Sequence, residues 1–165
     1  MSDEATLARL RFLVRLVARE AAHLRATDDR VFSRAFSVER ATGLAADIDD
    51  AERVEAFVAR FSRLQDTLGD KLLPVVLALL GESTGAAIDN LDRAERLGFV
   101  GSADQWMATR RLRNRMVHEY VEDPAVLAES LREGHALVPM LLATAAALLD
   151  EVRRRGWIEP ESALR

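Results

Sequence analysis

The sequence predicts an all-α fold, a bundle of about five helices in one domain over residues 1–165. Only 5% of the residues are aromatic while 49% are apolar, and leucine and alanine are abundant. Glycine and proline are few, a balance that favours helices over strands. Apolar side chains also recur at spacings of three and four residues, as on the buried face of a helix. A chain of this length can bury a sizeable core.

The first helix is expected over residues 3–26. Ser2 or Asp3 can cap its start. Arginines lie mostly on its outer faces, while its apolar face consists of residues three and four apart: Leu7, Leu10, Val14, Val17 and Ala21. This pattern is typical of a helix that packs one face against a core.

Residues 27–50 are the least regular part of the chain. Asp28 and Asp29 indicate a break after the first helix. Ser37 can start a short helix that Gly43 would end. We therefore expect an irregular segment here, with one helical turn or two.

A long helix is expected over residues 49–80, because apolar residues sustain one face throughout. Gly69 and Pro74 lie inside it. Pro74 has no backbone N–H to donate, so it should kink the helix or divide it. A turn from Gly81 to Gly85 follows.

A shorter helix is expected over residues 86–97, where Gly98 stops it. Ser102 is placed to cap the next helix, expected over residues 103–121. This helix carries most of the chemically reactive residues of the chain.

The last helix should begin at Pro124, which suits a first helical turn, with Asp123 as its cap. It is expected to run to about residue 155, with Pro139 as a possible kink. Its final turn holds Arg153, Arg154 and Arg155, where cations complement the helix dipole.

Composition excludes several classes of protein. The chain has no cysteine, which excludes a disulfide scaffold, a thiolate metal site and a cysteine nucleophile. Its net charge of −4 argues against broad coating of nucleic acid but leaves room for a local basic site. The start of the chain lacks the basic residues and apolar run of a secretory signal. The longest apolar runs, residues 72–80 and 138–149, fall short of the roughly 20 residues that span a bilayer. We expect a soluble, cytoplasmic protein.

Residues 113–120 read Arg-Asn-Arg-Met-Val-His-Glu-Tyr and include the only tyrosine of the chain. At about 100° per residue, several polar residues share one half of the helix. These are Arg110, Arg113, Asn114, His118 and Tyr120. The other half holds Leu112, Met116 and Glu119. The helix should therefore present a polar, reactive face opposite a partly apolar one.

Such a face suits RNA cleavage without a metal ion or cofactor. His118 can take the proton of a 2′-hydroxyl or give one to the leaving oxygen. Arg113 can hold the phosphate in a bidentate contact and stabilise its growing charge. Asn114 can orient the imidazole, and the neighbouring Arg110, Arg111 and Arg115 can bind RNA. The product would be a 2′,3′-cyclic phosphate.

A reaction that needs both an acid and a base is awkward with one histidine in each motif. A symmetric homodimer solves this by bringing two such faces together across a cleft. Dimerisation is therefore an expectation of the mechanism.

A purely structural interpretation stands beside the catalytic one. Asn114 and His118 can simply hydrogen-bond each other, and Tyr120 can cover the edge of the bundle. Arg113 can pair with an acid elsewhere, and Asp66 is a suitable inward acid. Trp106 is better explained by packing than by base stacking.

No metal site is expected. His23, His118 and His135 have no local ligand spacing, so a site built from them would need convergence of distant segments. The acidic cluster of residues 47–52 (Asp47, Asp49, Asp50 and Glu52) fits a helix N-terminus, where carboxylates are stabilised, better than a magnesium site.

The pattern Arg113-Asn114-x3-His118-x-Tyr120 resembles the R-x4-H-x-Y signature of HEPN domains, specifically that of HepT-like toxins. The layout is similar too: a long helix before a glycine turn, a short helix ending at Gly98, the motif helix and one more helix. The resemblance is specific over residues 94–122.

This resemblance implies a HEPN-like α-bundle that dimerises with its motifs facing each other. It implies metal-independent endoribonuclease activity in which Arg113 and His118 are essential. It also implies a partner, a minimal nucleotidyltransferase encoded next door that acts as antitoxin. The antitoxin would use ATP and magnesium to attach AMP to Tyr120, and that anionic adduct would block the cleft.

A second function, from a different class, remains open. The chain can be a non-catalytic subunit that presents substrates to a nucleotidyltransferase or docks it. A third is a bundle with structural roles only.

Overall fold

A computed structural model describes residues 3–118 and 123–159, and every regular element within them is a helix. The predicted all-α bundle is confirmed. The elements are α1 (Asp3–Val31), α2 (Val38–Gly43), α3 (Ile48–Asp66), the π-helical η1 (Thr67–Leu72), α4 (Leu73–Leu79), α5 (Ala87–Arg96), α6 (Ala103–His118) and α7 (Pro124–Arg154).

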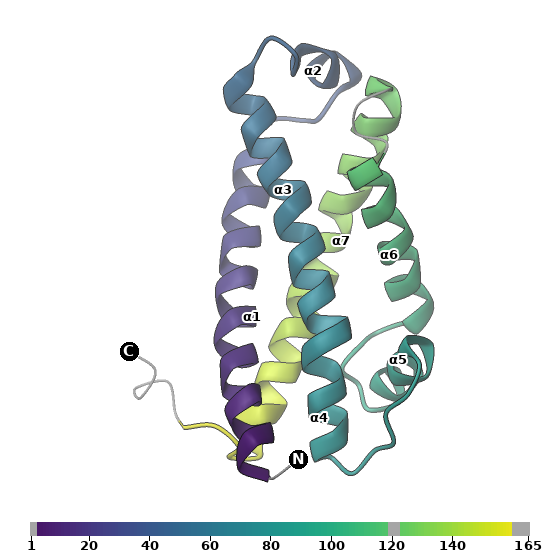
Figure 1. Ribbon diagram of the computed structural model, residues 1–165. Helices are drawn as coiled ribbons and strands as arrows, with labels where there is room; N and C mark the ends of the chain where they lie inside the picture. The colour runs from purple at the N-terminus through teal and green to yellow at the C-terminus, as the bar shows by residue number, and fades with distance from the viewer. Residues whose placement is uncertain (1–2, 119–122, 160–165) are drawn as a thin grey trace.

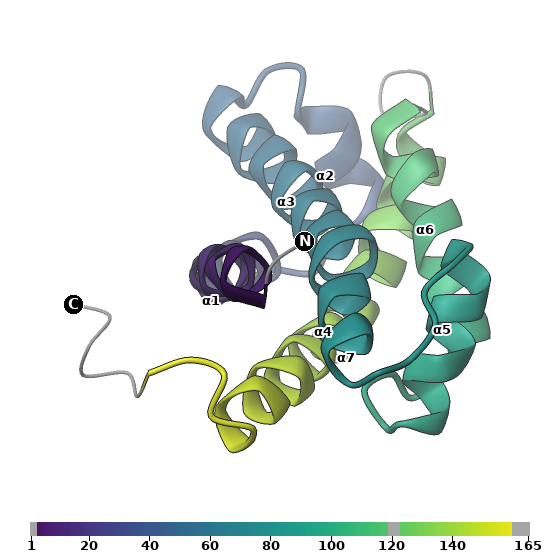
Figure 2. The same cartoon turned by 60° about the horizontal axis from the view of Figure 1, so that its bottom comes forward.

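Four long rods form the bundle: α1, the continuous α3–η1–α4 rod, α6 and α7. The α3–η1–α4 rod lies between α1 and α6, and α7 lies behind it (Figure 1). The short α2 covers one end of the bundle, and α5 packs beside α4 toward the other end (Figure 2). One core joins the rods, and its largest fully buried side chains include Trp106, Phe57, Phe61, Leu10 and Leu64.

The predicted end of the first helix near residue 26 is wrong, because α1 continues to Val31. Two polar residues in the expected break are buried and bound by neighbouring rods. Thr27 receives a hydrogen bond from Arg60 of α3, and the carboxylate of Asp28 contacts His135 of α7. These tertiary contacts satisfy side chains that would otherwise favour a turn.

The helix starts around residues 37–50 are as predicted. The Ser37 hydroxyl accepts a hydrogen bond from Arg40 N at 3.1 Å and caps α2. The Asp47 carboxylate accepts one from Asp50 N at 3.0 Å and caps α3. The acidic cluster therefore begins a helix.

The predicted division of the long helix at Pro74 is not found, because α3, η1 and α4 follow one another without a gap and the chain takes a wider turn just before the proline. Leu73 N donates to Leu68 O, five residues back, in place of the usual four. This register keeps the proline ring clear of the carbonyl that an α-helix would place against it. Gly69 lies in the same turn, where a Cβ atom would come within 3.1 Å of Trp106 Nε1.

The last three helices begin near their predicted positions. Gly98 follows α5 with a φ of 82°. The Ser102 hydroxyl accepts from Gln105 N at 3.1 Å at the start of α6, and Asp123 Oδ1 accepts from Ala125 N at 2.9 Å at the start of α7. The predicted end of the motif helix at residue 121 lies outside the described residues.

Within the described residues, α7 is long and apolar enough to cross a membrane, judged by length and composition only. One such helix is weak grounds for a membrane protein, because the core helix of a soluble bundle passes the same test. Here α7 packs on α1, α2, α3 and α6, and it contributes Leu131, Leu141 and Leu148 to the core.

Glu20 of α1 is a buried acid beside η1, and it gives a test of the fold. Burial raises the pKa of its carboxyl, although a hydrogen bond with Thr67 and the charges of Arg63 and Lys71 oppose the rise. A raised pKa means that the folded state prefers the protonated form. The protonated Glu20 carboxyl therefore adds to the free energy of unfolding below the unfolded-state pKa of about 4.3. This stabilisation is lost as the pH rises through the pKa of Glu20 in the folded state.

We therefore expect Glu20→Gln to stabilise the protein at pH 7, by an amount on the order of 1 kcal/mol or about 2–4 °C in Tm. At pH 4 the variant and the wild type should melt together. Thermal unfolding followed by circular dichroism at the two pH values measures this. A variant less stable than wild type at pH 7 would show that the ionised carboxylate stabilises the fold.

Candidate functional site

Helix α6 carries the motif, and its burial pattern sets where each motif residue lies. Trp106, Thr109, Leu112 and Met116 are buried. Leu112 and Met116 were predicted to lie on the apolar face of this helix, and both are buried. Trp106 is buried too, so its ring packs in the core, as predicted, and is not exposed for stacking on a base. Because Trp106 and Thr109 lie on the same side of the helix as Arg113, that side is an interface with the bundle. Arg113 therefore lies at the edge of a packed face, where the sequence predicted an open polar one.

Arg113 is held by an acid from another rod. Its Nη2 donates to Asp66 Oδ2 at 2.6 Å, and its Nη1 donates to Asn114 Oδ1 at 3.3 Å. The side chains of Arg113 and Asp66 are 31% and 38% exposed, so solvent reaches the pair. The structural interpretation of the motif predicted that Arg113 pairs with an acid such as Asp66, and this pair is found. Asn114 contacts this arginine, and its predicted role toward His118 stays a prediction.

Two residues in or next to this ion pair have buried polar atoms without a hydrogen-bond partner. Among the described residues, Arg113 Nε and both amide atoms of Gln65 are buried without a hydrogen-bond partner. Gln65 directly precedes Asp66 and is only 2% exposed. Buried unpaired groups of this kind are uncommon in folded proteins. These three atoms therefore have hydrogen-bonding capacity that the described side chains do not use.

The other predicted RNA-binding arginines lie around Arg113 on α6. Arg111 is exposed and Arg110 is half-buried. Arg115 is exposed but donates to Glu133 Oε2 of α7 at 2.9 Å. Such an exposed pair is weak and can exchange for a phosphate contact at little cost.

His118 is the last residue of α6, five positions after Arg113 on the same helix. The arrangement of its side chain and the position of Tyr120 lie outside the described residues. The catalytic role of His118 and the modification of Tyr120 therefore stay predictions.

A histidine and an acid from distant parts of the chain also meet, and the sequence did not reveal this pair. His135 Nδ1 lies 2.7 Å from Asp28 Oδ1, and Phe32 stacks on the imidazole with ring centroids 4.2 Å apart. Burial raises the pKa of Asp28, while the hydrogen bond from His135 opposes the rise. The two residues are 107 positions apart, so no local spacing could have predicted the contact.

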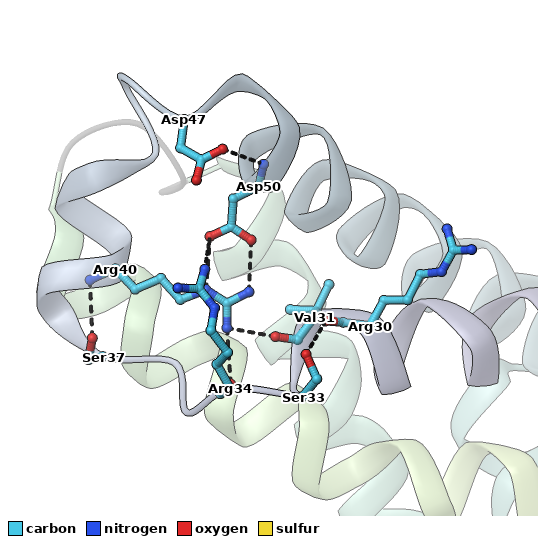
Figure 3. Close-up of polar contacts among 8 residues, drawn as sticks. All are labelled: Arg30, Val31, Ser33, Arg34, Ser37, Arg40, Asp47 and Asp50. Carbon is cyan, nitrogen blue, oxygen red and sulfur yellow. Dashed lines mark hydrogen bonds and ion pairs between the residues drawn. The ribbon is translucent and has the colours of Figure 1, made fainter.

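The acidic cluster predicted at residues 47–52 joins an ion-pair network instead of a metal site. Arg40 Nη2 lies 2.8 Å from Asp50 Oδ1 and Arg40 Nε donates to Asp50 Oδ2 at 2.8 Å, while Arg34 approaches the same carboxylate (Figure 3). Arg40 also donates to the carbonyl oxygens of Val31 and Arg34. Over residues 3–118 and 123–159, no group of three or more His, Asp or Glu side chains is arranged to hold a metal ion.

The fold and this site together define a helical bundle that presents an acid-anchored arginine on its motif helix. Comparison with protein-family models, with curated proteins and with solved structures gave no match. The function must therefore be argued from the residues themselves.

Proposed function

We propose that this protein is a metal-independent endoribonuclease, the toxin of a HEPN and nucleotidyltransferase toxin–antitoxin pair. Arg113 and His118 are its catalytic residues and Asn114 supports them. The observation that carries the proposal is the state of Arg113, which is partly exposed and anchored on one side by Asp66. An anchored guanidinium with free N–H groups is preorganised to receive a phosphate.

The reaction needs only groups of the protein and the RNA. His118 takes the proton of the 2′-hydroxyl, and the 2′-oxygen attacks the adjacent phosphorus. The bond to the 5′-oxygen breaks, and that oxygen receives a proton from the second histidine of a homodimer. The products are a 2′,3′-cyclic phosphate and a 5′-hydroxyl. Arg113 stabilises the charge that grows on the phosphoryl oxygens.

The partner in this proposal is a minimal nucleotidyltransferase that acts in the cytoplasm as antitoxin. It would transfer AMP from ATP to the hydroxyl of Tyr120, with release of pyrophosphate. The added phosphate brings negative charge two residues from His118 and would compete for Arg113.

The experiment that tests this function is cleavage of a structured RNA by the purified protein in EDTA. Intact mass must first show that Tyr120 is unmodified, since an adduct would imitate an inactive protein. Fragments with cyclic phosphate ends are expected. A dimeric, unmodified wild type that leaves the RNA intact would refute the proposal.

Asp66 gives a prediction on binding. Its carboxylate holds the Arg113 guanidinium in position for the phosphate, so Asp66→Asn should weaken RNA binding several-fold. The pair is about one-third exposed, so the variant should lose no more than about 1 kcal/mol of stability. Fluorescence anisotropy in a His118→Ala background measures binding without cleavage. Tighter binding would mean instead that the Asp66 carboxylate competes with the phosphate for Arg113, which would contradict the preorganised state of this arginine.

The same ion pair favours a second function, a non-catalytic subunit that docks or presents substrates to a nucleotidyltransferase. In that case Arg113 is held by Asp66 for structural reasons and need not meet RNA. Growth arrest on expression separates the two. Arrest that His118→Ala relieves is expected of the toxin, whereas a docking subunit would cause none.

A further inference from the structure

The exposed side of α1 carries a row of arginines that the proposed function does not use. Between residues 5 and 26 the charged residues are five arginines and one glutamate, and the glutamate, Glu20, is buried. Arg11, Arg15 and Arg19 are exposed and follow one another at intervals of four residues. Their Cα atoms are thus about 6 Å apart along the helix, comparable with successive phosphates of a nucleic-acid strand.

Basic residues of the neighbouring rod extend this row. Arg63 of α3 and Lys71 of η1 are exposed, and both act on the Glu20 carboxylate together with Arg19. The three cations therefore gather around one buried acid at the junction of α1 and η1. With Asp70 as the exposed acid next to Lys71, these three cations still outnumber the acids named at this junction, whereas the protein as a whole carries −4.

An exposed aromatic ring lies on the same face. Phe12 is 53% exposed, although phenylalanine is normally buried. It precedes Arg15 by three residues and Arg19 by seven, the spacing that places side chains on one side of a helix. No other phenylalanine, and neither tryptophan, is as exposed among the described residues.

We propose that this basic face, formed by Phe12, Arg15, Arg19, Arg63 and Lys71, binds single-stranded nucleic acid. The cations contact successive phosphates and the Phe12 ring stacks on a base, the combination by which proteins hold single strands without reading their sequence. A docked protein is less suitable, because the core of a protein interface is mostly apolar and this face offers only one large apolar side chain, Phe12.

The face is distinct from the motif. In Figure 2, α1 and α6 lie on opposite sides of the bundle with the α3–η1–α4 rod and α7 between them. A strand long enough to pass around the bundle could engage both. Binding at α1 stands whether or not the motif cleaves RNA, so the two proposals can fail separately.

The test measures binding of a fluorescent oligouridylate of about 15 nucleotides to the His118→Ala protein over a range of salt concentrations. In this background, Arg15→Gln combined with Arg19→Gln should weaken binding at least about ten-fold. It should also reduce the slope of log affinity against log salt by about 1.4, or about 0.7 for each lost phosphate contact. Phe12→Ala should weaken binding about five- to one-hundred-fold with the slope unchanged, because it removes stacking and no charge.

Arg96→Gln is the matched control, since Arg96 is an exposed arginine on α5, across the bundle from α1. It loses one charge and should bind as the His118→Ala parent does. Phe12→Tyr keeps the ring and should also bind like the parent. If the arginine pair and Phe12→Ala both behave like Arg96→Gln, the proposal is overturned. If polyglutamate competes as well as RNA and Phe12→Ala has no effect, the face is a site for acidic protein, and the proposal is likewise overturned.

Discussion

Replacing His118 with alanine should lower RNA cleavage about 100- to 10,000-fold, the contribution expected of a general acid or base. RNA affinity should stay close to that of wild type, because the imidazole acts on protons rather than on phosphate charge. Single-turnover cleavage in EDTA, with binding measured separately on an uncleavable 2′-deoxy substrate, distinguishes the two quantities.

Arg113 serves as the comparison within the same helix. Arg113→Ala should lose both cleavage and affinity, and it leaves Asp66 without its partner. Arg113→Lys keeps the charge but cannot make a bidentate contact, so it should restore affinity more than rate. Full activity in His118→Ala would refute the mechanism, whatever the arginine variants do.

Replacing Arg40 with alanine should cause the largest loss of stability, about 3–5 kcal/mol, because it leaves a buried carboxylate unpaired. The side chains of Arg40 and Asp50 are only 8% and 4% exposed, and Arg40 also satisfies the carbonyls of Val31 and Arg34 at the end of α1. For a chain of this length the loss corresponds to about 6–20 °C in Tm.

Arg155→Ala is the matched control for Arg40→Ala. It breaks an ion pair with Glu151 in which the arginine is 46% exposed, and it should cost no more than about 1 kcal/mol. Equal melting temperatures for the two variants would show that the α1–α2–α3 network does not stabilise the fold.

The same network predicts how stability depends on pH. The hydrogen bonds from Arg40 lower the pKa of Asp50 against the opposing effect of burial. A lowered carboxyl pKa gives stability that is present above the unfolded-state value, about 4, and is lost as the pH falls through the folded pKa. The gap in Tm between wild type and Arg40→Ala should therefore narrow below about pH 4.

The sequence predicted the fold well where the signal is local. Ser37, Ser102 and Asp123 were recognised as helix caps because capping needs only a side-chain oxygen three or fewer residues before its donor. A kink or division was expected at Pro74, whereas the rod stays continuous through a π-helical turn just before it, which was not predicted. The end of α1 was misplaced because Thr27 and Asp28 are satisfied by Arg60 and His135, which no local pattern brings near.

The candidate site was predictable in composition and only partly in arrangement. Arg113, Asn114 and His118 stand out by type and spacing along one helix. A helical wheel gives their angles but not which neighbouring rod covers them, so Arg113 was expected on an open face. Asp66 was a suitable partner by its inward position. Gln65 beside it gave no signal, since a glutamine within a helix is usually exposed.

The wide turn of η1 has a consequence for how the chain tolerates change. It inserts a rotational offset between α3 and α4, so that residues before and after it are not in one continuous helical phase. Asp66 stands directly before this offset, and Leu73, Val76 and Leu77 stand after it in the core. Loss of a single residue from the turn would return the rod to ordinary α-helix with α3 and α4 still facing nearly the same way, because a π-helical turn holds one more residue than an α-helical one over almost the same rotation. A deletion within α3 itself would instead rotate the residues on its two sides by about 100° relative to each other, so that Asp66 would turn away from Arg113 or the core side chains before the deletion would leave the core.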